Sequence, residues 1–168
     1  MLNELEEIIE CGGSPHPIEI ERMESPVASW ILLQIKAPLY FWNEFELTGI
    51  DIQGCPESAG SLLKKESLTL DDFSYPDSRT RQWLLEQIRN FKMDRYLYDH
   101  TDDLEEKREI ERRVIARLPN CYKVKRSVFL SHAIIRNICQ AGKNSRQIEW
   151  KLFCKALEDL IRKECEQY

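Results

Sequence analysis

The sequence has few glycines and no long apolar run. Its 168 residues include six glycines, which are scattered, so neither a glycine-rich phosphate loop nor a GxGxxG dinucleotide motif is present. No apolar stretch approaches the roughly 18 residues that a membrane-spanning helix needs. The first ten residues, MLNELEEIIE, are acidic and lack the basic and apolar parts of a signal peptide. These absences favour a cytoplasmic protein.

Regular cysteine spacing is also missing. No CxxC pair occurs, the spacings are wide, and only three histidines are available, so no zinc-binding template is met. Disulfide bonds are rare in the cytoplasm. We therefore expect structural or surface thiols and no metal site. The cysteines are Cys11, Cys55, Cys121, Cys139, Cys154 and Cys165.

Charge is distributed unevenly along the chain. Residues 1–106 carry 9 basic and 22 acidic side chains, a balance of −13, whereas residues 107–151 carry 12 basic and 3 acidic side chains, a balance of +9. Such a split indicates an anionic ligand or an acidic partner near the second segment. An arrangement in which the basic part faces the acidic part, within or between subunits, explains it equally well.

Two sets of charged residues are therefore candidate binding sites. The basic set could converge from a strand and two helix ends into a phosphate or nucleic-acid patch, although an ordinary basic surface is the alternative. It comprises Lys123, Lys125, Arg126, Arg136, Lys143 and Arg146. The acidic set could dock a basic protein surface. It comprises Asp94, Asp99, Asp102 and Asp103.

Hydrophobic periodicity and capping residues predict one α+β domain over residues 1–168, in which several helices pack on a small mixed or antiparallel sheet. Pro38 suits the first turn of a helix, and Pro119 ends another. Residues 49–66 are predicted to be an irregular loop. Strands are predicted at 29–36 and 123–130, and helices at 2–10, 38–45, 78–97, 103–118, 132–141 and 145–165.

The same patterns predict which side chains are buried. The nearly continuous apolar run 29–36 is typical of a buried strand, and the four tryptophans are expected in the core. Asp102 and Glu105 have the spacing of a capping box. Apolar stripes are predicted on two helices, formed by Leu84, Ile88 and Phe91 in 78–97 and by Leu104, Ile110, Val114, Ile115 and Leu118 in 103–118.

Three phrases, in this order, resemble one family. They are IKAPLYFWNEF (35–45), LTLDDFS (68–74) and the segment 118–161, which begins LPNCYKVKRSVFL and contains EWKLFC. Together they resemble the flavin-dependent thymidylate synthase superfamily, and in particular its short, uncharacterised phage and prophage proteins. The resemblance implies that superfamily's fold, a bacterial host, and self-association, since the family's sites lie between subunits.

The resemblance also implies that the family's reaction is lost. Counting from Ala37-Pro38, the family's RHR motif, which holds flavin and nucleotide phosphates, falls on Leu47-Thr48-Gly49, and no arginine or histidine occurs within 37–78. The family's closing asparagine and two arginines fall on Ser131, Ala133 and Gly142. We therefore expect no catalytic residues, no cofactor and no enzyme activity.

These observations lead to two functional hypotheses. The first is a non-catalytic, phage-type binding protein on a degenerate thymidylate synthase scaffold that inhibits or modulates a host protein, such as a nuclease or another defence component. The alternative is a protein that still binds a nucleotide or flavin through the cations of residues 123–146. Both predict a homo-oligomer whose partner is a host protein, a nucleotide or a nucleic acid.

Overall fold

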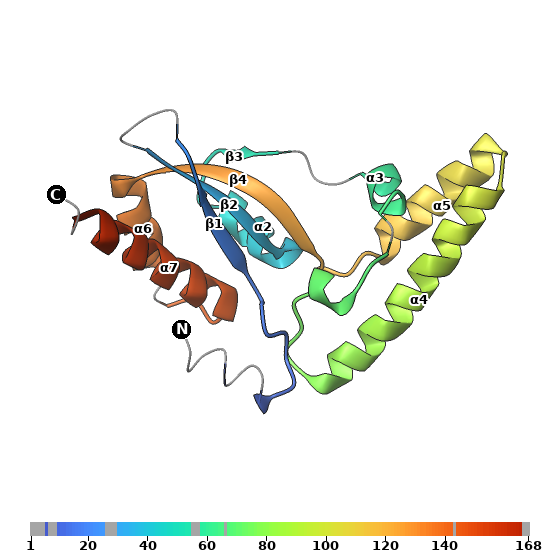
Figure 1. Cartoon of the computed structure of the whole chain (residues 1–168), viewed down its shortest axis with the longest axis horizontal. Coiled ribbons are helices and arrows are strands. Elements are labelled where there is room, and N and C mark those ends of the chain that lie inside the picture. The colour runs from blue at the N-terminus through green and yellow to red at the C-terminus, as the bar shows by residue number, and fades with distance from the viewer. Residues whose placement is uncertain are drawn as a thin grey trace.

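The computed structural model describes residues 6, 10–25, 30–54, 58–65, 67–142 and 144–165, except for the side chains of residues 164 and 165. These residues form a small antiparallel sheet and six α-helices (Figure 1). The predicted α+β class is therefore confirmed. The helix predicted at 2–10 lies outside the described residues, apart from residues 6 and 10.

The sheet has the strand order β1-β2-β4-β3, and all of its pairings are antiparallel. Its central strands match along their whole length, from Trp30 opposite Ser131 to Pro38 opposite Lys123. The edge strand β1 exposes most of its charged side chains, which explains why apolar periodicity does not predict it. The strands are β1 (Glu19–Met23), β2 (Trp30–Pro38), β3 (Ile52–Gln53) and β4 (Lys123–Ser131).

Alternate side chains of β2 and β4 bury one face of the sheet, as the pleat of a strand requires. This inner face comprises Ile31, Leu33, Ile35 and Ala37 of β2 with Val124, Val128 and Leu130 of β4. The apolar run at 29–36 predicts a strand buried on both faces, and this is wrong. Leu32 and Gln34 point to the outer face and are only half-buried there.

Helices α2 (Leu39–Glu46), α6 (His132–Gly142) and α7 (Ile148–Cys165) cover the inner face. The ring of Phe45 stacks on that of Trp150, with centroids 5.9 Å apart. The indole Nε1 of Trp42 donates 3.1 Å hydrogen bonds to Ala37 O and Val124 O. These bonds and the aromatic packing fix α2 between the sheet and α7.

Helices α4 (Ser78–His100) and α5 (Leu104–Arg117) form a hairpin that extends to one side of the sheet, away from α6 and α7 (Figure 1). Leu84, Ile88 and Phe91 of α4 are buried, as are Ile110 and Val114 of α5. The apolar stripe predicted for α4 is confirmed. None of the described helices is long and apolar enough to cross a membrane.

Several residues predicted to lie in the core are exposed. Leu104 and Ile115, assigned to the apolar stripe of α5, are 70% and 47% exposed, because α4 and the short helix α3 (Ala59–Leu63) cover only the Ile110 face of α5. Trp30 and Trp83 are 39% and 46% exposed, so the prediction that every tryptophan packs in the core is also wrong.

The segment predicted to be an irregular loop, residues 49–66, contains two short elements. These are β3 and the helix α3 (Ala59–Leu63). The side chain of Ser58 caps α3 by accepting a 3.1 Å hydrogen bond from the backbone N–H of Ser61. Leu62 and Leu63 are buried, so packing stabilises a helix that is too short to form alone.

Candidate functional site

A cleft of about 590 Å³ lies where the start of α7 meets the start of α2 and the segment 74–76. Sites for small molecules typically have volumes of roughly 300–1,000 Å³, so the cleft is large enough to hold a ligand. Its lining combines hydroxyl, thiol, carboxylate, amide, cationic and apolar side chains. They belong to Cys11, Pro17, Tyr40, Ser74, Tyr75, Pro76, Thr80, Cys121, Arg146, Gln147, Ile148, Glu149 and Lys151.

Backbone hydrogen bonds bring the walls of the cleft together around the segment that precedes β4. The N–H of Tyr40, in the first turn of α2, donates to Asn120 O at 3.1 Å. The N–H of Ser74 donates to Cys121 O at 2.8 Å. These two bonds hold the hydroxyl groups of Tyr40 and Ser74 on neighbouring walls, facing the start of α7.

Glu149 is the buried polar centre of the cleft. The residue is 3% exposed, and its Oε1 accepts hydrogen bonds from the hydroxyls of Tyr40 and Ser74, the second at 2.8 Å. No described residue donates to its Oε2, and no described lysine or arginine forms an ion pair with it. The carboxylate therefore has one oxygen held by the protein and one that is available to a ligand.

The surroundings of Glu149 explain how the fold accepts a buried carboxylate without a cation. Glu149 lies in the first turn of α7, where the helix dipole favours negative charge. Burial, and then the neighbouring charge of Glu149, raise the pKa of Tyr40 above its ordinary value. The phenol therefore stays protonated and remains a hydrogen-bond donor to the carboxylate.

Gln147, two residues before Glu149, also lines the cleft. The Oε1 atom of Gln147 is buried and has no hydrogen-bond partner among the described residues. A buried acceptor without a partner costs roughly 1–3 kcal/mol, and this oxygen is too enclosed to be reached from the cleft. Arg146 and Lys151, both exposed, place two cations on the same lining.

The two thiols in the cleft differ in exposure. Burial raises the pKa of Cys121 to about 11, so its reactive thiolate form is scarce at neutral pH. Cys11 is exposed, and Cys139 and Cys154 are buried between α6 and α7. Cys55 and the side chain of Cys165 lie outside the described residues. Within the described part of the chain, no three metal-ligating side chains gather.

The predicted basic patch does not converge. Lys123 is buried at one end of β4, where its Nζ donates to His16 O at 2.8 Å and lies 3.6 Å from Oε1 of Glu19. Lys125 shares that face of the sheet and is exposed. Arg126 points to the opposite face, because side chains alternate along a strand. These three cations therefore form no common surface.

Arg126 and the remaining members of the basic set lie in separate surroundings. The guanidinium of Arg126 lies 5.4 Å from the ring centroid of Trp42 and 2.8 Å from a carboxylate oxygen of Glu46. Arg136 is exposed on α6, and Lys143 lies outside the described residues. Among the described members of the set, Arg146 alone lines the cleft.

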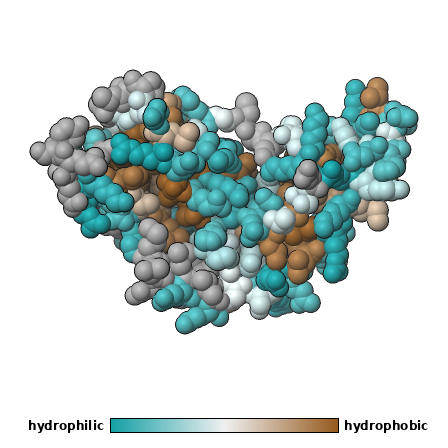
Figure 2. Space-filling view, in the orientation of Figure 1, coloured by the Kyte–Doolittle hydropathy of each residue, from teal (hydrophilic) through white to brown (hydrophobic). Residues whose placement is uncertain are grey.

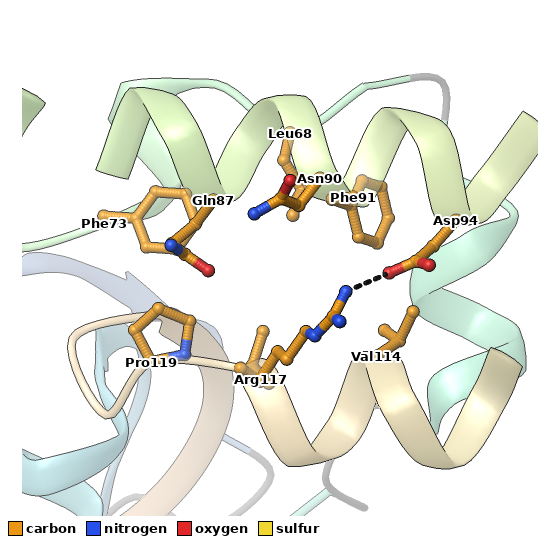
Figure 3. A pocket seen from close by; sticks show the side chains of 10 residues that line it. Leu68, Phe73, Gln87, Asn90, Phe91, Asp94, Val114, Arg117 and Pro119 are labelled. Atoms are coloured by element: carbon orange, nitrogen blue, oxygen red, sulfur yellow. Dashed lines mark hydrogen bonds and ion pairs between the residues drawn. The ribbon is translucent and has the colours of Figure 1, made fainter. Parts of the chain in front are cut away.

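One residue of the predicted acidic surface, Asp94, is buried. Asp94 is 4% exposed and forms ion pairs with Arg113 at 2.7 Å and Arg117 at 3.4 Å. The pair with Arg117 lies beside a crevice of about 30 Å³ between α4 and α5 (Figure 3). It joins the two helices of the hairpin and is not part of an exposed surface. Its position on the apolar side of α4, one turn after Phe91, is the sequence signal of this role.

The remaining acidic candidates lie near the turn of the hairpin. Asp99 is exposed and lies 3.6 Å from Arg95, one turn earlier on α4. Asp102 is exposed. Asp103 caps α5 by accepting a 2.8 Å hydrogen bond from the N–H of Glu105. The N-cap of α5 is therefore Asp103, and the prediction of a capping box that starts at Asp102 is wrong.

Sequence reasoning missed the polar centre of the cleft. It treated Tyr40 as part of the aromatic helix entry and did not single out Ser74, Gln147 or Glu149. One signal was present, because Glu149 stands between Ile148 and Trp150 at the start of an amphipathic helix. A carboxylate flanked by two apolar residues at such a position is a candidate for a buried acid. The hydroxyl partners come from segments distant in sequence, so spacing alone does not reveal them.

A scan of protein-family models finds no match to this chain, and a search of curated proteins finds none either. The relation to flavin-dependent thymidylate synthases thus stays a prediction that rests on the three sequence phrases.

Proposed function

We propose that this chain is a non-catalytic binding protein, of phage or prophage type, that holds a nucleotide-like ligand in the cleft at the start of α7. The observation that carries the proposal is the buried Glu149, whose Oε2 has no described partner in a cleft of about 590 Å³. The Oε2 acceptor of Glu149 suits an N–H group of a base. Arg146 and Lys151 suit a phosphate.

The chemistry of the cleft supports binding over catalysis. A general acid or base works best with a pKa near the working pH, and a nucleophilic cysteine needs a lowered pKa. Tyr40 and Cys121 both have raised pKa values. The resemblance to a synthase scaffold without its arginines and histidine points the same way.

Calorimetric titration with nucleoside monophosphates and with FAD tests the proposal. We expect a nucleotide to bind, with affinity that falls about tenfold in Arg146→Ala. Arg136→Ala, which removes an exposed cation of α6 that does not line the cleft, is the matched control and should leave the affinity unchanged. Absence of nucleotide binding would refute the nucleotide site. A yellow, flavin-loaded protein that supports a thymidine auxotroph would refute the non-catalytic assignment.

A second function, modulation of a host protein, is favoured by the surface of the α4–α5 hairpin. Met93, Tyr96 and Leu104 are 61%, 57% and 70% exposed, and Figure 2 shows apolar surface at the far end of this hairpin. Asp99 and Asp102 lie beside them in sequence and are also exposed. Exposed apolar side chains next to acids suit a partner with a basic, partly apolar surface.

Affinity capture from a bacterial host lysate tests this second function. We expect one partner to be retained by the wild type and by Arg136→Ala, and to be lost in the double variant Tyr96→Ser/Leu104→Ser. A partner that the double variant retains equally would contradict this use of the hairpin.

We also propose self-association, which follows from the resemblance. Light scattering coupled to size-exclusion chromatography should give a mass above that of the 19.9 kDa chain. A monomer at all concentrations tested would contradict it.

A further inference from the structure

Helix α4 carries a second apolar stripe, on the side away from its buried face. Trp83, Met93 and Leu97 are each more than one third exposed. At about 100° per residue, these three positions lie within about 80° of one another around the helix, and roughly opposite the buried Leu84 and Ile88. The helix has 23 residues, so the stripe runs along an element about 35 Å long. Figure 1 shows α4 along the outer side of the hairpin.

Charge changes sign along the same helix. Residues 78–92 carry four basic side chains and one acidic side chain, whereas residues 99–106 carry five acidic side chains and no lysine or arginine. Arg79 lies at the start of the apolar stripe and Asp102 just beyond its end, and both are exposed. One end of the stripe is thus basic and the other acidic. Each end is therefore complementary in charge to the opposite end of an identical helix.

Two pairs of residues on this stripe share one midpoint. Position 90 is midway between Trp83 and Leu97, and 90.5 is midway between Arg79 and Asp102. In a dimer with two-fold symmetry, if one residue contacts a second residue of the other copy, the reverse contact also forms. A two-fold axis near position 90 therefore places Trp83 against Leu97, and Arg79 against Asp102, twice each.

The antiparallel arrangement is the one that joins unlike charges. In a parallel pair of α4 helices, each Arg79 would face another Arg79 and each Asp102 another Asp102, and facing like charges suppress such a pairing. The apolar contact adds to the selection. Tryptophan is among the residues that most often contribute a large share of the binding energy at an interface, and Trp83 is exposed at the basic end of the stripe.

We infer that a second copy of this chain docks antiparallel along α4, with Trp83 packed on Leu97 and Arg79 paired with Asp102 across a two-fold axis near position 90. This inference rests on the proposed self-association and adds the surface that forms it. Met93 belongs both to this stripe and to the surface proposed for a host protein. A host protein bound there would therefore displace the second copy.

Sedimentation velocity of the full chain over a range of concentrations tests the inference. The wild type should form a dimer. Trp83→Ala should raise the dimer dissociation constant at least about tenfold. Arg79→Glu and Asp102→Arg should each do the same, because each places like charges in contact twice. Arg136→Glu reverses an exposed charge on α6, away from this stripe, and should leave the dissociation constant unchanged.

A mixture of the two charge variants distinguishes loss of this contact from a folding defect. Arg79→Glu has acid at both ends of the stripe, and Asp102→Arg has base at both ends, so each repels its own copies and attracts the other variant. At concentrations where the wild type is a dimer, neither should dimerise alone, whereas an equimolar mixture should. The double variant Arg79→Glu/Asp102→Arg should dimerise as the wild type does, because both pairs again join opposite charges.

The possible failures are distinguishable. A dimer that withstands Trp83→Ala and both charge reversals would overturn the α4 surface and leave self-association standing. A monomeric wild type would overturn both, and loss of host-protein capture in Trp83→Ala would then assign this face to the host protein. If Trp83→Ala fails to fold, the mixture decides alone, and charge variants that stay monomeric when mixed would overturn the antiparallel pairing.

Discussion

The hydroxyl of Ser74 donates a 2.8 Å hydrogen bond to Oε1 of Glu149, although 75 positions separate the two residues in the chain. This bond joins the segment before α4 to the first turn of α7. Tyr40 of α2 donates to the same oxygen. One buried carboxylate thus ties three distant segments together and forms the floor of the cleft.

Removal of this hydrogen bond should destabilise the fold. In Ser74→Ala the buried carboxylate loses one of its two donors, and we expect the free energy of unfolding to fall by about 1–2 kcal/mol. Ser67→Ala, which changes an exposed serine in the same connecting region, is the control and should have no measurable effect. Urea denaturation measures both. Equal stability of the two variants would contradict a structural role for the Ser74 bond.

The ion pairs in the hairpin give a second prediction. Asp94 is buried and holds two arginines of α5, so Asp94→Ala should lower the free energy of unfolding by about 2–4 kcal/mol. Asp99→Ala, one turn further along α4, breaks a solvent-exposed pair and should change it little. Similar losses in the two variants would show that burial of Asp94 does not matter for stability.

Contact between α6 and α7 gives a third prediction. A Cβ atom added at Gly142 would lie 2.4 Å from the sulfur of Cys154, so Gly142→Ala should cost about 1–3 kcal/mol through overpacking. Cys154→Ala removes that sulfur. In the Cys154→Ala background, adding Gly142→Ala should therefore lower the free energy of unfolding much less than it does in the wild type. At Gly60 the added Cβ meets only a flexible carboxylate at 3.4 Å, so Gly60→Ala is the matched control.

The double-mutant cycle decides this third prediction. Independent, additive effects of the substitutions at residues 142 and 154 would contradict the proposed steric contact. Alanine favours helix more than glycine does, so a Gly60→Ala variant that is as unstable as Gly142→Ala would show that contact with Cys154 is not the cause of the loss.

The thiol of Cys121 gives a pH dependence. Its pKa is about 11 in the folded chain against 9.0 in an exposed cysteine, because burial disfavours the thiolate. Since the folded pKa is raised, this group stabilises the fold fully below pH 9, and its contribution is lost as the pH rises from 9 through 11. The stability of the wild type minus that of Cys121→Ala should therefore decrease across this interval.

Chemical denaturation of both proteins at several pH values between 8 and 11 measures this difference. Cys11→Ala, which removes an exposed thiol, is the control and should show no such trend. A difference between wild type and Cys121→Ala that stays constant with pH would contradict the effect of burial on this thiol.

The elements of the fold follow largely from local signals. Pro38 before an aromatic helix, the apolar face of 84–91 and Pro119 at a helix end are short-range patterns, and each corresponds to an observed element. The edge strand β1 and the short helix α3 do not follow from such patterns. Both depend on packing against residues distant in sequence, which periodicity does not contain.

The candidate site could not be predicted in the same way. Charge density pointed to β4, yet Lys123 and Arg126 are on opposite faces of the sheet and pair with Glu19 and Glu46. The composition does show that cations are present in this segment. It does not show which of them already have internal partners, and this decides whether they can bind a ligand.

The crystal structure of the protein soaked with the nucleoside monophosphate that binds most tightly in solution tests the central claim most directly. The account predicts that the base lies in the cleft, with one of its N–H groups within about 3.2 Å of Oε2 of Glu149. The phosphate should lie against Arg146. Density for the nucleotide elsewhere on the molecule, or a cleft left unoccupied at saturating nucleotide, would contradict it.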